Sequence, residues 1–291
     1  MKLGLQIPNF TLPSGPSEIR SYLRDTARRA EDAGFENLWV MDHFFQINHI
    51  GPAEMDMLEA YTTLGFLAAV TERIQLGTMV TGVTYRNPGI LAKMVATLDV
   101  LSGGRAWLGI GAAWFEREHH GLGIEFPSLK ERFEQLEEAL QVVNQMWSPN
   151  NGPYKGWHFR LKETLCVPQP LRTPPILIGG MGEKKTLRMV AQYAQACNMF
   201  EHSGLKTLEK KLAVLKTHCE KLERDYHSIS KTVIGQTSIR DQKSADKLLH
   251  KLEQLSTLGF DTAIYAIKDP TDTKSLDLFG EYVIPRAAAL G

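Results

Sequence analysis

A chain of 291 residues with 43% hydrophobic and 23% charged side chains has the composition of a globular protein with a large core. Its 33 basic and 33 acidic residues balance, which argues against nucleic-acid binding, because that function needs a basic surplus. Three widely spaced cysteines without a CxxC pair argue against a disulfide framework and a cysteine zinc site. Neither a targeting segment nor a long apolar run is present, so we expect a soluble cytoplasmic protein without membrane contact.

Short apolar runs alternate with segments of helical period along the whole chain. The predicted strands are 3–8, 37–41, 74–80, 105–111, 176–178, 196–200, 232–239 and 261–267. The predicted helices are 17–33, 57–70, 88–101, 128–147, 185–193, 205–227, 245–258 and 276–289. Local signals mark several ends: Gly34 ends the first helix, and Ser128 with Glu131 forms a capping box.

This succession of strand and helix units, without a break in composition, predicts one (β/α)8 TIM-barrel domain over 1–291. A doubly wound open sheet also alternates strands and helices, but the length and the number of units favour the barrel. Segment 148–175 is rich in proline, glycine and aromatic residues and has no helical period. We interpret it as an insertion between the fourth helix and the fifth strand.

Functional groups of such barrels lie on the loops that follow the strands, and Asp42-His43 follows the second predicted strand. Imidazole titrates near neutrality, so His43 is a candidate general acid or base with Asp42 as its partner. The alternative is a structural histidine that caps the strand end. No metal site is expected, because His119-His120 beside Glu116 and Glu118 lacks a metal-binding spacing and reads as a solvated helix start or lid.

Three further loops contain small residues that let a ligand approach the backbone. Gly77-Thr78 ends the third strand, and Gly109-Ile110-Gly111 ends the fourth without the third glycine of a Rossmann fingerprint. After it, Trp114 either stacks on a ligand or covers the barrel end. Gly179-Gly180-Met181 leads into a helix expected near Lys184, which suits an anion site, although a tight turn is the simpler reading.

Several segments, in this order and spacing, resemble the bacterial-luciferase-like superfamily and in particular its deazaflavin-dependent branch. They are Asn-Leu-Trp-Val-Met-Asp-His-Phe at 37–44, Ile-Gln-Leu-Gly-Thr at 74–78, Tyr-Arg-Asn-Pro at 85–88, Leu-Asp-Val-Leu-Ser-Gly-Gly-Arg at 98–105, Gly-Ile-Gly at 109–111, Pro-Gln-Pro at 168–170, Pro-Pro-Ile at 174–176 and Gly-Gly at 179–180. The resemblance implies a barrel whose cofactor ring lies against a bulge after the third strand, with a non-proline cis peptide bond at Met79-Val80. It also implies His43 near the reactive ring and frequent homodimers.

Nine residues are expected cofactor contacts, four of them from the loops (Thr78, Gly111, Ala112 and Trp114) and five from the resemblance (Met79, Val80, Gly179, Gly180 and Met181). The resemblance implies hydride transfer between coenzyme F420 and a small organic substrate, an alcohol or an activated double bond, with His43 as general acid or base. One alternative is an FMN-dependent monooxygenase that receives reduced flavin from a separate reductase. Another is a flavin-binding barrel without catalysis. Ala112-Ala113-Trp114 lacks the polar side chains that some deazaflavin dehydrogenases place there, so the substrate class stays open.

Overall fold

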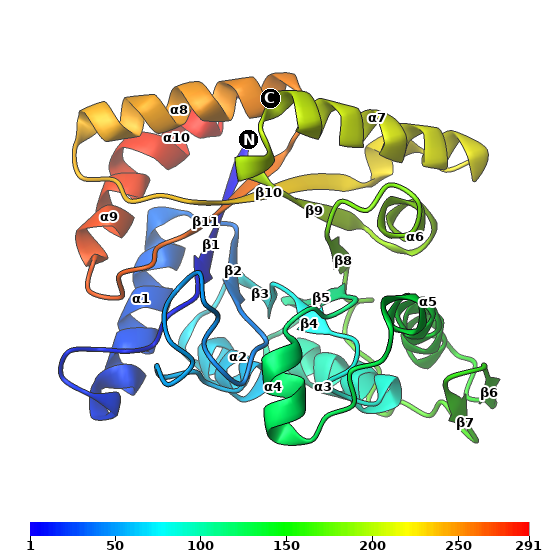
Figure 1. The fold of residues 1–291 in the computed structure, drawn as a ribbon. Coiled ribbons are helices and arrows are strands. Elements are labelled where there is room, and N and C mark those ends of the chain that lie inside the picture. Colours follow the sequence, from blue (N-terminus) through cyan, green and yellow to red (C-terminus); the bar gives the residue numbers. More distant parts are fainter. Residues whose placement is uncertain (291) are drawn as a thin grey trace.

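The computed structural model describes residues 1–290 and has the predicted architecture, a closed barrel of 8 parallel strands surrounded by helices (Figure 1). The barrel strands are β1 (Lys2–Ile7), β2 (Asn37–Val40), β3 (Gln75–Thr78), β5 (Ala106–Gly111), β8 (Ile176–Gly179), β9 (Ala196–Phe200), β10 (Ser230–Gln236) and β11 (Thr262–Ala266). They pair in the order β3-β2-β1-β11-β10-β9-β8-β5, and the β3–β5 pairing closes the ring. The alternative of an open sheet is therefore wrong.

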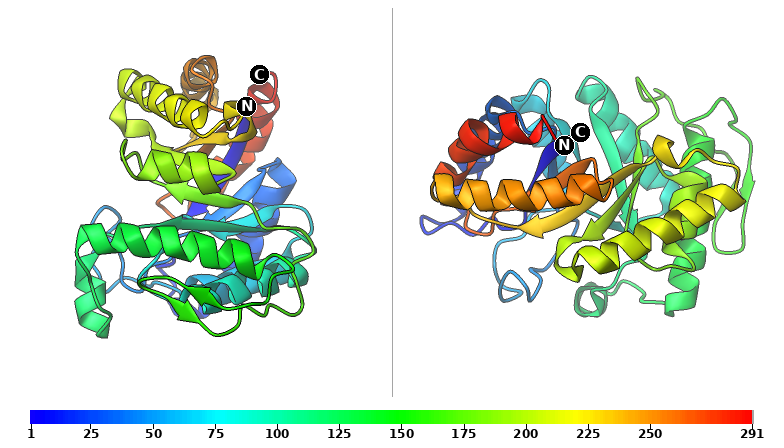
Figure 2. Two further views of the ribbon diagram at one scale, coloured as in Figure 1. Left: turned by 90° about the vertical axis from the view of Figure 1, so that its right-hand side faces the viewer. Right: turned by 90° about the horizontal axis from the view of Figure 1, so that it is seen from above.

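Helices cover the outside of the barrel, as the two rotated views show (Figure 2). They are α1 (Ile19–Ala33), α2 (Ala60–Val70), α3 (Pro88–Leu101), α4 (Glu116–Leu122), α5 (Leu129–Met146), α6 (Thr186–Tyr193), α7 (Leu205–Lys221), α8 (Gln242–Thr257), α9 (Thr273–Leu278) and α10 (Ile284–Ala287). The expected end signals are in place. Gly34 follows α1 with φ 94°, and Ser128 and Glu131 form the capping box of α5.

Side chains alternate along each strand between the helix layer and the barrel interior. The interior holds a small cluster of Trp39, Met79, Leu177, Ala196 and Ile264. The Trp39 and Trp107 rings lie 5.9 Å apart. The sequence suggested that Gly77 lets a ligand approach the backbone. In the structure a Cβ on Gly77 would stand 2.6 Å from Trp39, so this glycine makes room for the core tryptophans instead.

Several predicted boundaries are wrong for local reasons. The helix predicted from residue 57 begins at Ala60, because the Glu59 side chain accepts hydrogen bonds from the first amides of α2. The predicted strand 74–80 divides into β3 and the two-residue β4 (Thr81–Gly82), with the cis peptide bond Met79-Val80 between them. The predicted helices 205–227 and 276–289 are also divided, the first by a separate 3-10 turn at Tyr226–Ser228 and the second by a π-helical segment at Phe279–Val283.

The insertion at 148–175 contains one short antiparallel hairpin, β6 (Tyr154–Lys155) and β7 (Arg160–Leu161). Glu138 of α5 fixes it by accepting the backbone amides of residues 157, 158 and 159 at 2.7–2.9 Å. The insertion is thus anchored on the outer side of α5 and does not enter the barrel.

The two ends of the described chain lie side by side (Figure 1), since the Met1 ammonium donates to the carbonyls of Ala287 and Leu290 at 2.7 and 2.6 Å. Within residues 1–290, none of the helices has both the length and the apolar character needed to span a bilayer.

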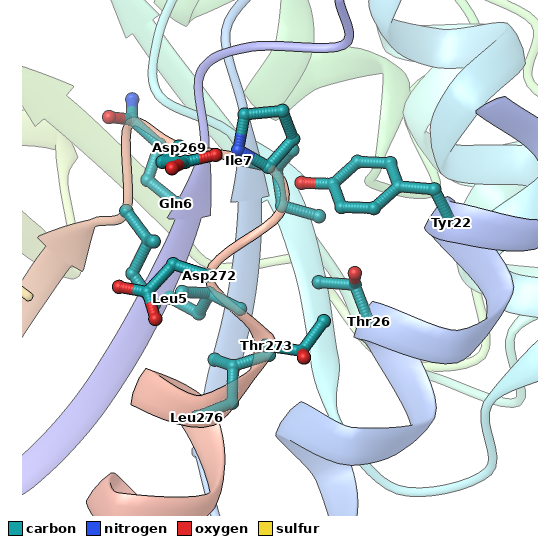
Figure 3. A pocket seen from close by; sticks show the side chains of 11 residues that line it. Leu5, Gln6, Ile7, Tyr22, Thr26, Asp269, Asp272, Thr273 and Leu276 are labelled. Carbon is teal, nitrogen blue, oxygen red and sulfur yellow. The ribbon is translucent and has the colours of Figure 1, made fainter. Parts of the chain in front are cut away.

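A cavity between β1, α1 and the loop before α9 has a volume of about 10 Å³ (Figure 3). That volume suits one water molecule and excludes a substrate.

Candidate active site

Hydrogen bonds from neighbouring parts of the barrel fix Met79 and Val80, the bulge between β3 and β4. The Met79 amide donates to the carbonyl of Val40 at 2.8 Å, and the Gln6 side-chain amide donates to the carbonyl of Met79 at 3.3 Å. The Thr78 hydroxyl bonds the Gly109 carbonyl at 2.9 Å. The cis bond at Met79-Val80 confirms what the resemblance implied. Thr78 itself is buried, so its hydroxyl serves the barrel wall and does not face a ligand.

Three glycines surround this bulge. A Cβ on Gly109 would stand 1.8 Å from the Thr78 carbonyl oxygen, and Cβ atoms on Gly111 and Gly179 would each stand 3.1 Å from Val80 methyl carbons. These glycines therefore make room first for the protein's own Val80, a reason that sequence reasoning missed. Val80 itself is half-buried and packs against the backbone of these glycines.

His43 lies at this mouth, beyond the end of β2. Its Nδ1 atom lies 2.6 Å from Oε1 of Glu118. Within residues 1–290, Nε2 has no hydrogen-bond partner, and it is not one of the buried polar atoms left without one, so it reaches the surface of the mouth. The edges of Trp114 and Phe115 pack against the imidazole, with ring centroids 5.6 and 5.7 Å away. His43 thus offers one free nitrogen inside an aromatic surround.

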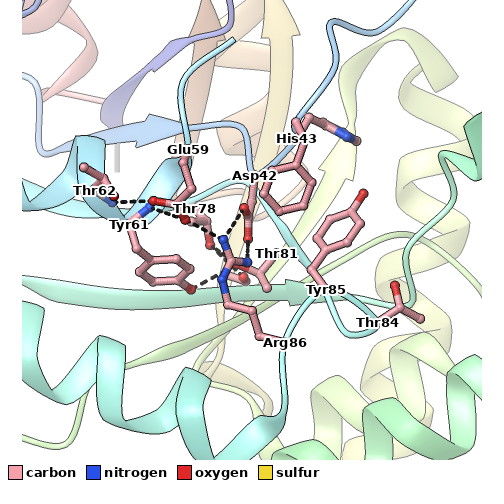
Figure 4. Close-up of polar contacts among 12 residues, drawn as sticks. Asp42, His43, Glu59, Tyr61, Thr62, Thr78, Thr81, Thr84, Tyr85 and Arg86 are labelled. Atoms are coloured by element: carbon pink, nitrogen blue, oxygen red, sulfur yellow. Dashed lines mark hydrogen bonds and ion pairs between the residues drawn. The ribbon is translucent and has the colours of Figure 1, made fainter. Parts of the chain in front are cut away.

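Asp42 is not the partner of His43, and this prediction is wrong. Its carboxylate, 0% exposed, accepts two hydrogen bonds from Arg86 at 2.6 and 3.0 Å (Figure 4). Arg86 also pairs with Glu59 at 2.6 Å and lies over the Tyr61 ring at 4.9 Å. Burial raises the pKa of Asp42, while the Arg86 guanidinium opposes this rise. Neighbouring side chains in extended backbone point in opposite directions, so Asp42 joins β2 to α2 while His43 faces the mouth.

Glu118 of α4 contacts His43, although the sequence predicted a solvated segment here. Its side chain is fully buried. Besides His43, it accepts the amides of Phe44 at 2.8 Å and Phe45 at 3.2 Å, and the hydroxyl of Tyr85. Burial alone would raise the pKa of Glu118, but the His43 and Tyr85 donors and the Phe44 amide outweigh burial and hold this pKa below its ordinary value. Glu118 is therefore a buried carboxylate.

The other residues of α4 show why the sequence analysis wrongly expected this whole segment to be solvated. His119 is also fully buried, with its ring nitrogens bonded to the Thr84 hydroxyl at 2.6 Å and the Phe115 carbonyl at 2.8 Å. Of the four residues expected in solvent, Glu116 and His120 are exposed, whereas Glu118 and His119 are buried. Among residues 1–290, no cluster of three or more metal-ligating side chains is present. The missed signal was the helical spacing from buried Phe115 to positions 118 and 119.

The loop after β8 has only part of the expected anion-binding geometry. Gly180 has φ 114°, and its amide donates to the Asn198 carbonyl at 3.1 Å, so this amide is already engaged and the cofactor contact of Gly180 stays a prediction. Helix α6 begins at Thr186, two residues after the expected Lys184. The Met181 side chain is half-buried, with its sulfur 4.0 Å from the Ser203 hydroxyl. Gly179 and Met181 keep their assignment as expected cofactor contacts.

Trp114 lies on the loop after β5, the strand paired with β8, and is 56% exposed. It stacks on Phe115 at 5.1 Å and does not close the barrel end. The loop that presents it is fixed, because Arg132 of α5 donates to the carbonyl of Ala113, whose φ is 57°. Ala112 precedes this turn and is half-buried. A large aromatic face is therefore available beside His43.

Comparison with known proteins agrees with this fold. Residues 1–273 match the family model described as luciferase-like monooxygenase, and the chain belongs to that family. A curated relative, the F420-dependent glucose-6-phosphate dehydrogenase of Amycolatopsis mediterranei, is 31% identical over 228 residues, which cover 75% of this chain and 64% of the relative. The chain spans about half to two thirds of the length of the curated relatives it matches.

Two solved structures share the whole architecture. An F420-dependent secondary alcohol dehydrogenase, bound to an F420-acetone adduct, superposes with a TM-score of 0.82 at 19% identity, covering 99% of both chains. The monooxygenase RslO1 from Streptomyces bottropensis superposes with a TM-score of 0.79 at 17% identity, covering 98% of this chain and 99% of the other. At these identities the similarity shows the fold.

Proposed function

We propose that this protein is an oxidoreductase that transfers a hydride between coenzyme F420 and a small organic substrate, an alcohol or an activated double bond. The observation that carries the proposal is the free Nε2 of His43 at the barrel mouth, on an imidazole whose Nδ1 is held by Glu118. A fixed imidazole with one accessible nitrogen is suited to general acid or base catalysis.

The residues at the mouth fit a planar cofactor of this type. Gly111 and Gly179 have no side chain and Ala112 has only a methyl group, so no long side chain comes from these three positions beside the Val80 bulge. We infer that these residues and the backbone at Met79-Val80 would hold the ring of the cofactor, and that Trp114 would flank the substrate. The cofactor supplies a carbon centre that accepts or gives hydride. The choice of F420 is supported by relatives named as F420-dependent dehydrogenases.

In alcohol oxidation, the Nε2 atom of His43 accepts the proton of the substrate hydroxyl while the carbinol carbon loses its hydride. In the reverse direction the same nitrogen returns the proton to the carbonyl oxygen. The rings of Trp114 and Phe115, both packed edge-to-face with the imidazole, would keep water from part of its surface, which strengthens its hydrogen bond to the substrate.

The second candidate function is an FMN-dependent monooxygenase served by a separate reductase. It is favoured by the family description and by the fold shared with RslO1. Anaerobic turnover separates the two candidates. We expect secondary alcohols to bleach the absorbance of oxidised F420 in the absence of dioxygen. Substrate-dependent uptake of dioxygen with reduced FMN, together with no reaction of F420, would instead identify a monooxygenase.

We also propose that the protein forms a homodimer through the outer face of α2 and α3. A groove of about 610 Å³ runs between these helices and the insertion, and its rim exposes Ile90 (60%), Leu101 (71%) and Leu165 (55%). Lys93 and Glu163 line the same groove, so a two-fold copy can pair opposite charges. A second copy is the occupant that satisfies both the apolar rim and this charge pattern.

The proposed dimer is tested by size-exclusion chromatography with light scattering, which measures the molar mass of the eluted protein. Wild type should run at twice 32.6 kDa, and a double variant with Ile90→Glu and Leu101→Glu should run as a monomer. Leu122→Glu is the matched control, because Leu122 is 47% exposed on α4 and does not line the groove. A monomeric wild type at high concentration would contradict the proposed dimer.

We propose a cytoplasmic location, supported by three buried free cysteines.

A further inference from the structure

We propose that Glu118 is the positioning residue of this site, and that it dictates which nitrogen of His43 carries the proton. This inference rests on the proposed function only for its consequence in catalysis. The structural part concerns a hydrogen bond between α4, the helix that connects β5 to α5, and the loop that follows β2. It can be measured without any cofactor.

The first step is the direction of the hydrogen bond. An ionised carboxylate only accepts hydrogen bonds, so at the 2.6 Å contact the Nδ1 atom of His43 must be the donor. The neutral imidazole then carries its single proton on Nδ1, and Nε2 keeps its lone pair. That lone pair faces the mouth, where the substrate proton must be accepted. When His43 takes this proton, the resulting cation lies against the carboxylate and is stabilised by it.

The second step is that the carboxylate cannot turn. Its Oε2 atom accepts the amides of Phe44 at 2.8 Å and Phe45 at 3.2 Å, and these are backbone groups of the same loop that carries His43. Oε1 faces His43 and the Tyr85 hydroxyl. Every neighbour of the two oxygens is thus a donor, and each oxygen has a fixed set of them.

This geometry makes Glu118→Gln an informative substitution. The Gln oxygen must take the place of Oε2, because an NH2 group there would face two backbone donors. The Gln NH2 group then faces Nδ1 of His43 and donates to it. His43 is forced to carry its proton on Nε2, and the lone pair turns away from the mouth. The same shape is kept, while the nitrogen that faces the substrate changes from acceptor to donor.

The other ionisable groups around this pair do not offer His43 a substitute anion. Asp42 is engaged by Arg86, and Arg86 is shared with Glu59. Tyr85 donates to Glu118, and burial raises its pKa, so it stays a neutral hydroxyl. His119 is bonded to Thr84 and to a backbone carbonyl. Glu118 is thus the anion in contact with the imidazole.

The test is nitrogen NMR of the protein labelled with 15N-histidine, at a pH about 1.5 units above the ordinary histidine value of about 6.5. Of the 9 histidines, the His43 signals are identified by their loss in His43→Gln. Wild type should show a protonated Nδ1 and an unprotonated Nε2. Glu118→Gln should show the opposite tautomer, and Glu118→Asp should keep the wild-type tautomer. A wild type with its proton on Nε2, or a Gln variant with the wild-type tautomer, would overturn the inference.

Turnover gives the second readout. With F420 and an alcohol that wild type oxidises, Glu118→Gln should lower kcat by about 10³–10⁴-fold, as expected when a catalytic imidazole is held in the wrong tautomer, with little change in KM. Equal losses in Glu118→Asp and Glu118→Gln would point to a merely structural role. If wild type shows the expected tautomer but no F420 chemistry, the proposed function fails and the positioning role of Glu118 stands.

Discussion

The carboxylate of Glu118 lies 2.6 Å from Nδ1 of His43, although 75 residues separate the two in the sequence. This contact connects α4 to the end of β2 and leaves Nε2 of His43 as the free nitrogen at the barrel mouth. The neighbouring Asp42 contributes to a different network, in which Arg86 joins it to Glu59. The consequences of this division between proton transfer and structural support can be measured separately.

Replacing His43 by Ala should reduce turnover by about 10²–10⁴-fold, the usual contribution of a general acid or base. Cofactor affinity should change little, because the cofactor contacts we propose are made by other residues. Steady-state kinetics and a binding titration on the same preparation check this. Unchanged turnover would make His43 a structural residue.

Asp42→Asn should act on stability. It removes the charge of a buried partner of Arg86, and loss of one partner from a buried ion pair costs roughly 3–5 kcal/mol. Denaturant unfolding measures this loss. Asp25→Asn is the control, since Asp25 pairs with Arg24 at the same kind of distance, 2.8 Å, but in solvent, and its loss should leave the midpoint unchanged. A stable Asp42→Asn protein without turnover would restore Asp42 as a catalytic residue.

Two alanine substitutions in β5 should lower stability by different amounts, because the added Cβ atom meets backbone in one variant and a side chain in the other. In Gly109→Ala the new Cβ would stand 1.8 Å from a backbone oxygen, so we expect at least the roughly 1–3 kcal/mol typical of overpacking. In Gly111→Ala the nearest atom is a Val80 methyl carbon at 3.1 Å, which can shift, so the loss should be smaller. Equal thermal midpoints for the two variants would show that the bulge is not packed as described.

The Glu118 carboxylate also predicts a pH dependence of stability. Its folded-state pKa is lowered from 4.5, so its stabilising contribution is full above pH 4.5 and is lost as the pH falls through the lower folded value. Wild type should therefore lose stability on acidification in this window, and Glu118→Gln should lose less. Unfolding free energies measured from pH 7 downward test the difference. Parallel curves for the two proteins would mean that Glu118 is not the carboxylate described here.

Much of the fold could be predicted from the sequence, because the barrel strands are short apolar runs and the helices show apolar residues at helical spacing. The cap residues Gly34, Asn87 and Ser128 act as their types suggest. Boundaries failed where a side chain from elsewhere decides them, as with the Glu59 cap. The π-helical segment that divides the last predicted helix comes directly before Ile284-Pro285, and the missing N–H of this proline is a local signal that was overlooked.

The candidate site was predicted only in part. His43 could be found, because it follows a buried strand and a barrel places such loops at one end. Its partner could not, because adjacency suggested Asp42, while extended backbone turns neighbouring side chains apart. The contact with Glu118 depends on how α4 folds back over the barrel. Gly109 and Gly179 have steric causes that lie far away in the sequence, at the end of β3 and in the bulge that follows it.

The central claim, that this barrel holds F420 beside His43, is tested most directly by fluorescence titration of the purified protein with oxidised F420 and with FMN. We predict saturable binding of F420 at least about tenfold tighter than binding of FMN, a difference of about 1.4 kcal/mol. The His43→Ala variant should bind F420 as wild type does. Tighter binding of FMN, or no binding of either compound, would contradict the account.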